Sequence, residues 1–184
     1  MITILGVDPG LAKCGWVRAR MSLNGSLQVH VAGLIKTVKN SRPSVSQDNR
    51  RRAREIHRGI APMFDGVDLV AFEAESLPRS SSAAAKTAMS RGVLIGICEE
   101  RRIPMIEATP QAIKAYLTGN NGASKKQVEA AVLATAGFES MGLLLENVAP
   151  SQREHAYDAA GAILACQNHE IVLAMLQMTH RPHD

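Results

Sequence analysis

The sequence predicts an α/β domain with a mixed β-sheet, and the order of its segments supports this fold class. The chain opens with three apolar, extended segments over residues 2–8, 15–21 and 27–35. Asn24-Gly25 lies between the second and third segments, and this dipeptide strongly favours a β-hairpin. Helical and extended segments then alternate, which is typical of parallel strands added to a sheet.

Two of the predicted strands end in a carboxylate. Residues 2–8 have the apolar, β-branched character of a strand buried on both faces, and Pro9-Gly10 forces a turn directly after Asp8. A second apolar strand, 67–73, ends at Glu73. The remaining predicted elements are helices over 46–63 and 83–101, a short strand at 103–107, and helices from Pro110, from Ser124 to Gly137 and over 152–178.

The composition is that of one globular domain. Of the 184 residues, 46% are hydrophobic and 3% are aromatic, so aliphatic side chains must build the core. We expect a single domain over 1–178 and a frayed tail over 179–184. No apolar run of about 18 residues and no basic leader are present, and the three cysteines are far apart. These features predict a cytoplasmic, reducing location and are compatible with a viral or organellar origin.

The last helix adds further polar groups to the two strand-end acids. His155 and Asp158 are three residues apart and share a helix face, and the apolar run 159–165 that follows must pack on the sheet. Carboxylates at such buried ends are costly unless they are paired or bound to metal. Their convergence suits Mg²⁺ or Mn²⁺, and two such ions can promote phosphodiester cleavage by water. Taken singly, Asp8 could open a turn and Asp158 could complement the helix dipole.

A basic cluster and the net charge of +4 suggest a polyanionic partner. Arg50, Arg51, Arg52 and Arg54 lie together on the helix predicted over 46–63. They are candidates for contacts with DNA phosphates, and the alternative is a solvated helix face.

Four segments, in this order, resemble the RuvC family of Holliday-junction resolvases within the ribonuclease H-like superfamily. They are ILGVDPGLAKCGW, FEAES, the long run from Ser82 to Val132, and HAYDAAGAILA. Within the long run, PQAIKAYLTGNNGASKKQV, which ends at Val128, is the most specific segment. Asp-Pro-Gly alone is also found in sugar kinases and actin-like ATPases. The resemblance implies a ribonuclease H-like fold with a five-stranded mixed sheet.

The same resemblance implies roles for individual residues. Asp8, Glu73 and Asp158 would be catalytic acids that bind Mg²⁺, with Mn²⁺ able to substitute and two ions in each site. Lys125 would lie near the active site and offset phosphate charge. Many members have an acid where this chain has His155, so His155 would be a fourth metal ligand or an orienting base.

Further positions relate to DNA binding. By resemblance, Lys126 and Arg91 join the arginines of the 46–63 helix as candidates for backbone contacts. Some members place an aromatic residue shortly after the second acid, where it stacks on bases. Ser76 and Leu77 occupy this region here, so the sequence does not indicate a cut-site preference.

The function predicted from the sequence is a metal-dependent endonuclease that nicks four-way DNA junctions symmetrically as a homodimer, with the 83–101 helix as the interface. The alternatives are a related nuclease for flaps, forks or structured RNA, and a module that binds branched DNA without cutting it. A sugar-kinase-like enzyme would need a second glycine-rich phosphate loop, and none is visible. The sequence does not identify a branch-migration helicase partner.

Overall fold

The computed structural model describes residues 1–74 and 80–179 and contains a mixed five-stranded sheet in the order β3-β2-β1-β4-β5. The strands are β1 (Ile2–Asp8), β2 (Lys13–Met21), β3 (Leu27–Lys36), β4 (Leu69–Glu73) and β5 (Met105–Ala108). β1, β2 and β3 pair antiparallel, whereas β4 and β5 add parallel to β1. The predicted fold class and hairpin are confirmed.

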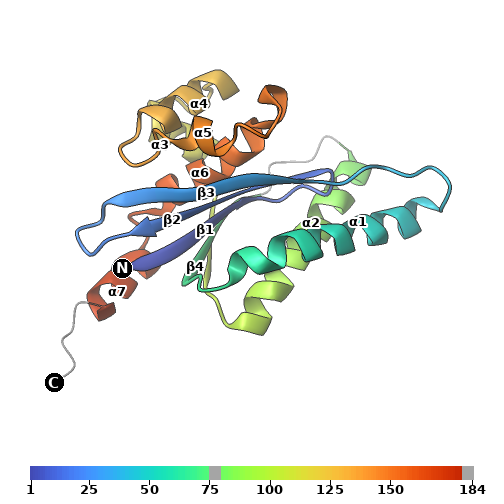
Figure 1. Cartoon of the computed structure of the whole chain (residues 1–184), viewed down its shortest axis with the longest axis horizontal. Helices are drawn as coiled ribbons and strands as arrows, with labels where there is room; N and C mark the ends of the chain where they lie inside the picture. The colour runs from blue at the N-terminus through green and yellow to red at the C-terminus, as the bar shows by residue number, and fades with distance from the viewer. Residues whose placement is uncertain (75–79, 180–184) are drawn as a thin grey trace.

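Helices cover both faces of the sheet (Figure 1). One face carries α1 and α2, and the other carries α6 with α3, α4 and α5 beyond it. Their bounds are α1 Val45–Ile60, α2 Ser81–Arg101, α3 Pro110–Thr118, α4 Lys125–Ala134, α5 Met141–Leu144, α6 Glu154–Cys166 and α7 Glu170–Thr179, with short 3₁₀ turns at Ala61–Phe64 and Pro150–Gln152. α4 begins with the capping box predicted from Ser124 and Gln127.

Three predicted helix ends were wrong, each for a local reason. The helix predicted over 152–178 is two helices, α6 and α7, bent by 70° at residues 167–169, where His169 Nδ1 accepts a hydrogen bond from Ile171 N–H and starts the new helix. α1 ends before Pro62, whose missing N–H cannot continue an α-helix. α4 ends at Ala134, and Gly137 lies in the following turn at φ +86°.

The structure describes only the first residue of the tail predicted over 179–184. α7 extends to Thr179, one residue beyond the predicted domain boundary, and the rest of the predicted frayed tail lies outside the described residues. Among the helices of the described ranges, none is long and apolar enough to cross a membrane alone. The bent pair α6 and α7 passes on length and composition together, but α6 is mostly buried in the core.

α6 lies unusually close to the sheet because two strands present glycine beneath it. A Cβ on Gly6 would stand 2.2 Å from the Ala159 carbonyl oxygen, and one on Gly15 would stand 2.1 Å from the His155 carbonyl oxygen. Both distances are far below van der Waals contact. Glycine at these two positions therefore lets the α6 backbone pack directly on β1 and β2.

We predict that Gly15→Ala lowers the free energy of unfolding by about 2 kcal/mol, because the added methyl group must push the start of α6 away from β2. Chemical denaturation measures this change. Gly142→Ala is the matched control, because a Cβ there meets nothing within 4 Å. Equal stability of the two variants would contradict this account of the contact.

Candidate active site

The pleat of the sheet directs both strand-end acids to the face covered by α6. In β1, Ile4 and Gly6 face α6 while Leu5 and Val7 face the opposite core, so Asp8 falls on the α6 side. The same alternation in β4 puts Glu73 on that side. β1 and β4 are parallel neighbours with Val7 opposite Phe72, so the two acids end adjacent strands.

α6 completes the cluster from above. His155 and Asp158 lie on its first two turns, and they share with Asp8 a space in which one ligand atom of each residue lies within 4.8 Å of the others. His155 Nδ1 lies 2.6 Å from Asp8 Oδ2. The structure thus brings together the residues predicted at the ends of two strands and on the last helix.

The carboxylates of the cluster repel one another. Burial, followed by the charges of Asp8 and Asp158, raises the pKa of Glu73 to about 9. Burial and the charge of Asp8 raise the pKa of Asp158 to about 6. Without a cation, the folded protein therefore holds these acids in an unfavourable arrangement at neutral pH.

Lys125 brings a cation to the edge of this cluster. Its Nζ lies 2.8 Å from Glu154 Oε2 and 3.9 Å from Asp158 Oδ2, while its side chain keeps 58% exposure. Burial lowers the pKa of Lys125, but the hydrogen bond to Glu154 and the charge of Asp158 outweigh it and raise the value overall. The same hydrogen bond lowers the pKa of Glu154. Because its carboxylate is paired with Lys125, Glu154 is a weaker candidate for a metal ligand than His155.

Arg91 supports the site from the side of α2. Its guanidinium donates to the backbone carbonyl of Glu73 at 3.4 Å and pairs with the carboxylate of Glu107 on β5. These contacts tie α2 to the ends of β4 and β5. Sequence comparison pointed to Arg91 only as a DNA contact, because a bond to a backbone carbonyl leaves no pattern in the sequence.

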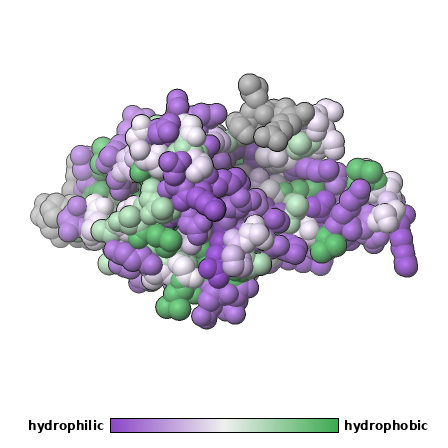
Figure 2. All heavy atoms as spheres, turned by 90° about the horizontal axis from the view of Figure 1, so that it is seen from above, coloured by the Kyte–Doolittle hydropathy of each residue, from purple (hydrophilic) through white to green (hydrophobic). Residues whose placement is uncertain are grey.

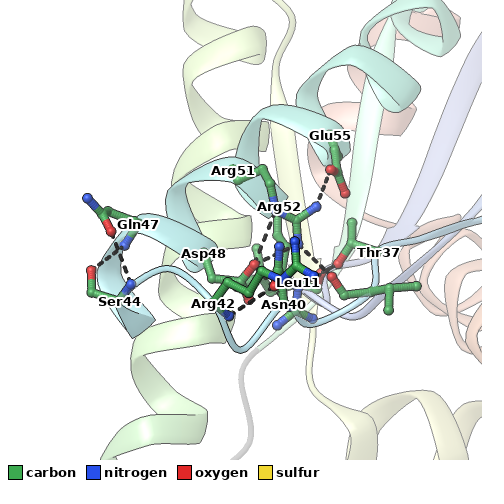
Figure 3. Close-up of polar contacts among 11 residues, drawn as sticks. Leu11, Thr37, Asn40, Arg42, Ser44, Gln47, Asp48, Arg51, Arg52 and Glu55 are labelled. Carbon is green, nitrogen blue, oxygen red and sulfur yellow. Dashed lines mark hydrogen bonds and ion pairs between the residues drawn. The ribbon is translucent and has the colours of Figure 1, made fainter.

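The arginine cluster on α1 divides into two kinds of residue. Arg51 pairs with Asp48 and Glu55 and donates to the Val38 carbonyl oxygen, and Arg52 is buried with its Nε 2.7 Å from Thr37 Oγ1 (Figure 3). The other two members of the predicted cluster, Arg50 and Arg54, are exposed.

The face of the protein seen in Figure 2 is mainly hydrophilic, with hydrophobic residues in smaller patches. Lys126, at the start of α4, is exposed beside Lys125. Ser76 and Leu77, at the place where some family members have an aromatic residue, lie outside the described residues.

The donor set fits a hard divalent cation. Carboxylate oxygens with one imidazole nitrogen are ligands that Mg²⁺ and Mn²⁺ accept, and a cation would relieve the repulsion that raises the pKa values of Glu73 and Asp158. A mixed sheet in the order β3-β2-β1-β4-β5, with such a cluster at the ends of β1 and β4, is the arrangement expected of a metal-dependent nuclease of the ribonuclease H-like class.

Comparison with known proteins identifies the family within this class. Residues 4–139 match the family described as crossover junction endodeoxyribonuclease RuvC. The RuvC of Chlamydia abortus is 30% identical over 128 residues, which cover 68% of this chain and 74% of that protein. The chain therefore belongs to the RuvC family of crossover junction endodeoxyribonucleases, and the predicted family and enzyme class are confirmed.

Solved structures agree on the fold. The structure of Thermus thermophilus RuvC matches with a TM-score of 0.69 and 22% identity, over 96% of this chain and 97% of that chain. The structure of T. thermophilus RuvC in complex with a Holliday junction substrate matches with a TM-score of 0.69 and 20% identity, over 90% and 92% of the two chains. The family match ends before α6, so the place of His155 and Asp158 in the site rests on the geometry described above.

We predict that Glu73→Gln stabilises the metal-free protein at alkaline pH. The folded state holds the Glu73 proton more tightly than the unfolded chain, so this contribution to stability is present below pH 4.5 and is lost as pH rises toward about 9. In EDTA, the melting temperature of Glu73→Gln should exceed that of the wild type at pH 8, and the difference should vanish near pH 4.

The control is Glu146→Gln, which removes an exposed carboxylate away from the cluster. Adding Mg²⁺ or Mn²⁺ at pH 8 should narrow the difference between wild type and Glu73→Gln, because only the wild type keeps the full ligand set. A Glu73→Gln protein that melts below the wild type in EDTA at pH 8 would show that the carboxylate is not under repulsion.

Proposed function

We propose that this chain is a metal-dependent endonuclease that resolves four-way DNA junctions by paired, symmetric nicks. The observation that carries the proposal is the convergence of Asp8, Glu73, His155 and Asp158 at one end of the sheet, in a chain of this family. A T. thermophilus relative has been solved with a Holliday junction substrate, and its fold supports the choice of substrate.

Asp8, Glu73 and Asp158 would hold Mg²⁺, with Mn²⁺ as a substitute and two ions as the full complement. When bound, such ions supply an activated water and charge stabilisation at the departing oxygen. The chain's own part is to keep these acids fixed at strand and helix ends, so that the ligands need little rearrangement. The exposed ammonium of Lys125, placed beside Asp158, would offset the charge of the scissile phosphate.

His155 would position Asp8 and accept a proton. A neutral imidazole whose Nδ1–H donates to Asp8 Oδ2 over 2.6 Å carries its free lone pair on Nε2. That nitrogen lies 3.7 Å from Glu154 Oε1, outside hydrogen-bonding distance. It would therefore be available either to a metal ion or to a proton released from the attacking water.

The homodimer would form through the outer face of α2. Ser90, Leu94 and Ile97 are buried against the body of the protein, whereas Ala88 and Gly92 are exposed on the other side of the helix. Met89 and Ile95 add apolar surface with 37% and 36% exposure. Gly92 and Gly96 have no heavy atom within 4 Å of an added Cβ, so a second helix could approach closely there. Two copies related by a twofold axis would match the approximate symmetry of a junction.

We predict that Asp8→Asn and Glu73→Gln abolish cleavage of a labelled four-way junction in Mg²⁺ while junction affinity stays within about threefold of the wild type. The amides keep the shape of the site but are weaker metal ligands. Gel analysis of nicked strands measures cleavage, with Glu146→Gln as the control. Full cutting by either variant would refute the metal assignment.

The same assay separates the alternative functions. Equal amounts of four-way junction, fork, flap, duplex and structured RNA at one salt concentration would be compared with the wild-type protein. Preferential paired nicking of the four-way junction supports the proposal. Faster cutting of a fork or flap would indicate the related nuclease, and binding without cutting in either Mg²⁺ or Mn²⁺ would indicate a binding module.

We predict that His155→Ala lowers turnover at least tenfold and that His155→Asp restores part of it with a stronger preference for Mg²⁺ over Mn²⁺. Turnover of the wild type, His155→Ala and His155→Asp, measured in Mg²⁺ and in Mn²⁺ at one pH, tests this. Unchanged turnover and an unchanged metal preference in His155→Ala would leave the residue with only a structural role.

We predict that Ala88→Arg converts the dimer to a monomer and suppresses paired nicking, because a buried guanidinium without a partner opposes association. Light scattering at micromolar concentration reports the mass. Ala112→Arg, at an exposed position of α3, is the control. A monomeric wild type that still makes symmetric nicks would contradict the dimer.

A further inference from the structure

A polar cavity lies between α1, the start of α2 and the loop that leaves β3, and no step of the proposed cleavage uses it. Its volume is about 250 Å³, and the residues that line it include Lys39, Asn40, Asn49, Arg52, Ser82 and Lys86. Most of these side chains are hydrogen-bond donors, and three of them are cations. The cavity is smaller than the usual binding site of a drug-sized ligand.

Arg52 is a buried cation in the wall of this cavity, and a hydrogen bond fixes its position. The residue is only 5% exposed, and its Nε donates to Thr37 Oγ1 at 2.7 Å. Among the described residues, the Arg52 side chain makes no other hydrogen bond. Its terminal nitrogens are not fully buried, so they remain open to solvent. A guanidinium held rigid by its Nε therefore presents its terminal N–H groups to whatever enters the cavity.

The one acid in the lining does not neutralise this charge. Asp48 is 2% exposed, but its Oδ1 accepts hydrogen bonds from Arg51 and from the Asn40 backbone N–H (Figure 3). The hydrogen bond from Arg51 lowers the pKa of Asp48. Arg51 thus carries the hydrogen bonds to Asp48, and the charge of Arg52 also lowers the pKa of Asp48. One acid therefore faces three cations in the lining, Arg52, Lys39 and Lys86, and the cavity keeps an excess of positive charge.

A chain of contacts connects the cavity to the active-site end of the sheet. Thr37, which holds Arg52, donates through its Oγ1 to the Leu11 carbonyl oxygen at 2.6 Å, and its backbone N–H donates to Ala12. Leu11 and Ala12 lie in the turn that follows Asp8. The cavity and the acidic cluster therefore stand at the same end of the sheet, on opposite faces.

We propose that this cavity binds a phosphate group, which Arg52 anchors and Lys39 and Lys86 neutralise. Planar guanidinium and ammonium donors around a small polar space favour a tetrahedral oxyanion over an apolar ligand. The phosphate would come from the backbone of the DNA that crosses this end of the sheet, a reading that rests on the proposed function, or from a free mononucleotide.

Binding measurements in EDTA test the proposal without any dependence on cleavage. A labelled four-way junction is titrated with wild type, Lys39→Ala, Lys86→Ala and the control Arg20→Ala, which removes one exposed charge at the other end of the sheet. Among the described residues, neither lysine side chain makes a hydrogen bond or an ion pair, so both variants should fold. Each should weaken binding about three- to tenfold at 100 mM salt and reduce the salt slope by about 0.9. Arg20→Ala should do neither.

A second arm separates the two sources of phosphate. Inorganic phosphate and thymidine 5′-monophosphate are titrated while the backbone amide resonances of Asn40 and Ser82 are followed by NMR. Weaker DNA binding by both lysine variants assigns the site to the DNA backbone. Unchanged DNA binding, with resonance shifts that Lys86→Ala abolishes, assigns it to the free anion. If DNA binding matches that of Arg20→Ala and neither anion shifts these resonances, the proposal is overturned, whether or not the wild type cuts junctions.

Discussion

The close contact between α6 and the sheet is the constraint on which the rest of the structure depends. Gly6 and Gly15 let the carbonyl oxygens of Ala159 and His155 lie where a Cβ would otherwise stand. This approach brings the first turns of α6 down to the end of β1, so that His155 Nδ1 reaches Asp8 at 2.6 Å. A helix held one side-chain layer higher would leave the strand acids and the helix acid too far apart to share an ion.

The electrostatics of the site oppose folding in the absence of a cation. Burial and like charge raise the pKa values of Glu73 and Asp158, and Lys125 relieves only part of this because it is exposed and paired with Glu154. The hydrophobic cores on both faces of the sheet must offset that cost. Such an arrangement is expected of a site that is preorganised for a charged ligand rather than for its own stability.

The same end of the sheet is organised differently on its two faces. On the α6 face the side chains are acidic and converge on one small space. On the α1 and α2 face they are basic, and the contacts from Arg52 through Thr37 to Leu11 fix them relative to the turn after Asp8. A polyanion that crosses this end of the sheet would contact Lys125 beside the acids on one face and the cations of the cavity on the other face. The net charge of the whole chain does not reveal this separation.

The sequence alone determined the strand order at the start of the chain, the acids at the ends of two strands and the capping box of α4. These are local features, since side-chain alternation, Asn24-Gly25 and Ser124 with Gln127 act over a few residues. It also supplied the family through four ordered motifs. Tertiary structure decided the pairing of Arg91 with the Glu73 carbonyl and the division of the α1 arginines into exposed and internally bonded side chains. Each of these depends on which surfaces far apart in the chain come into contact, and a periodic pattern along one helix carries no information about its partner.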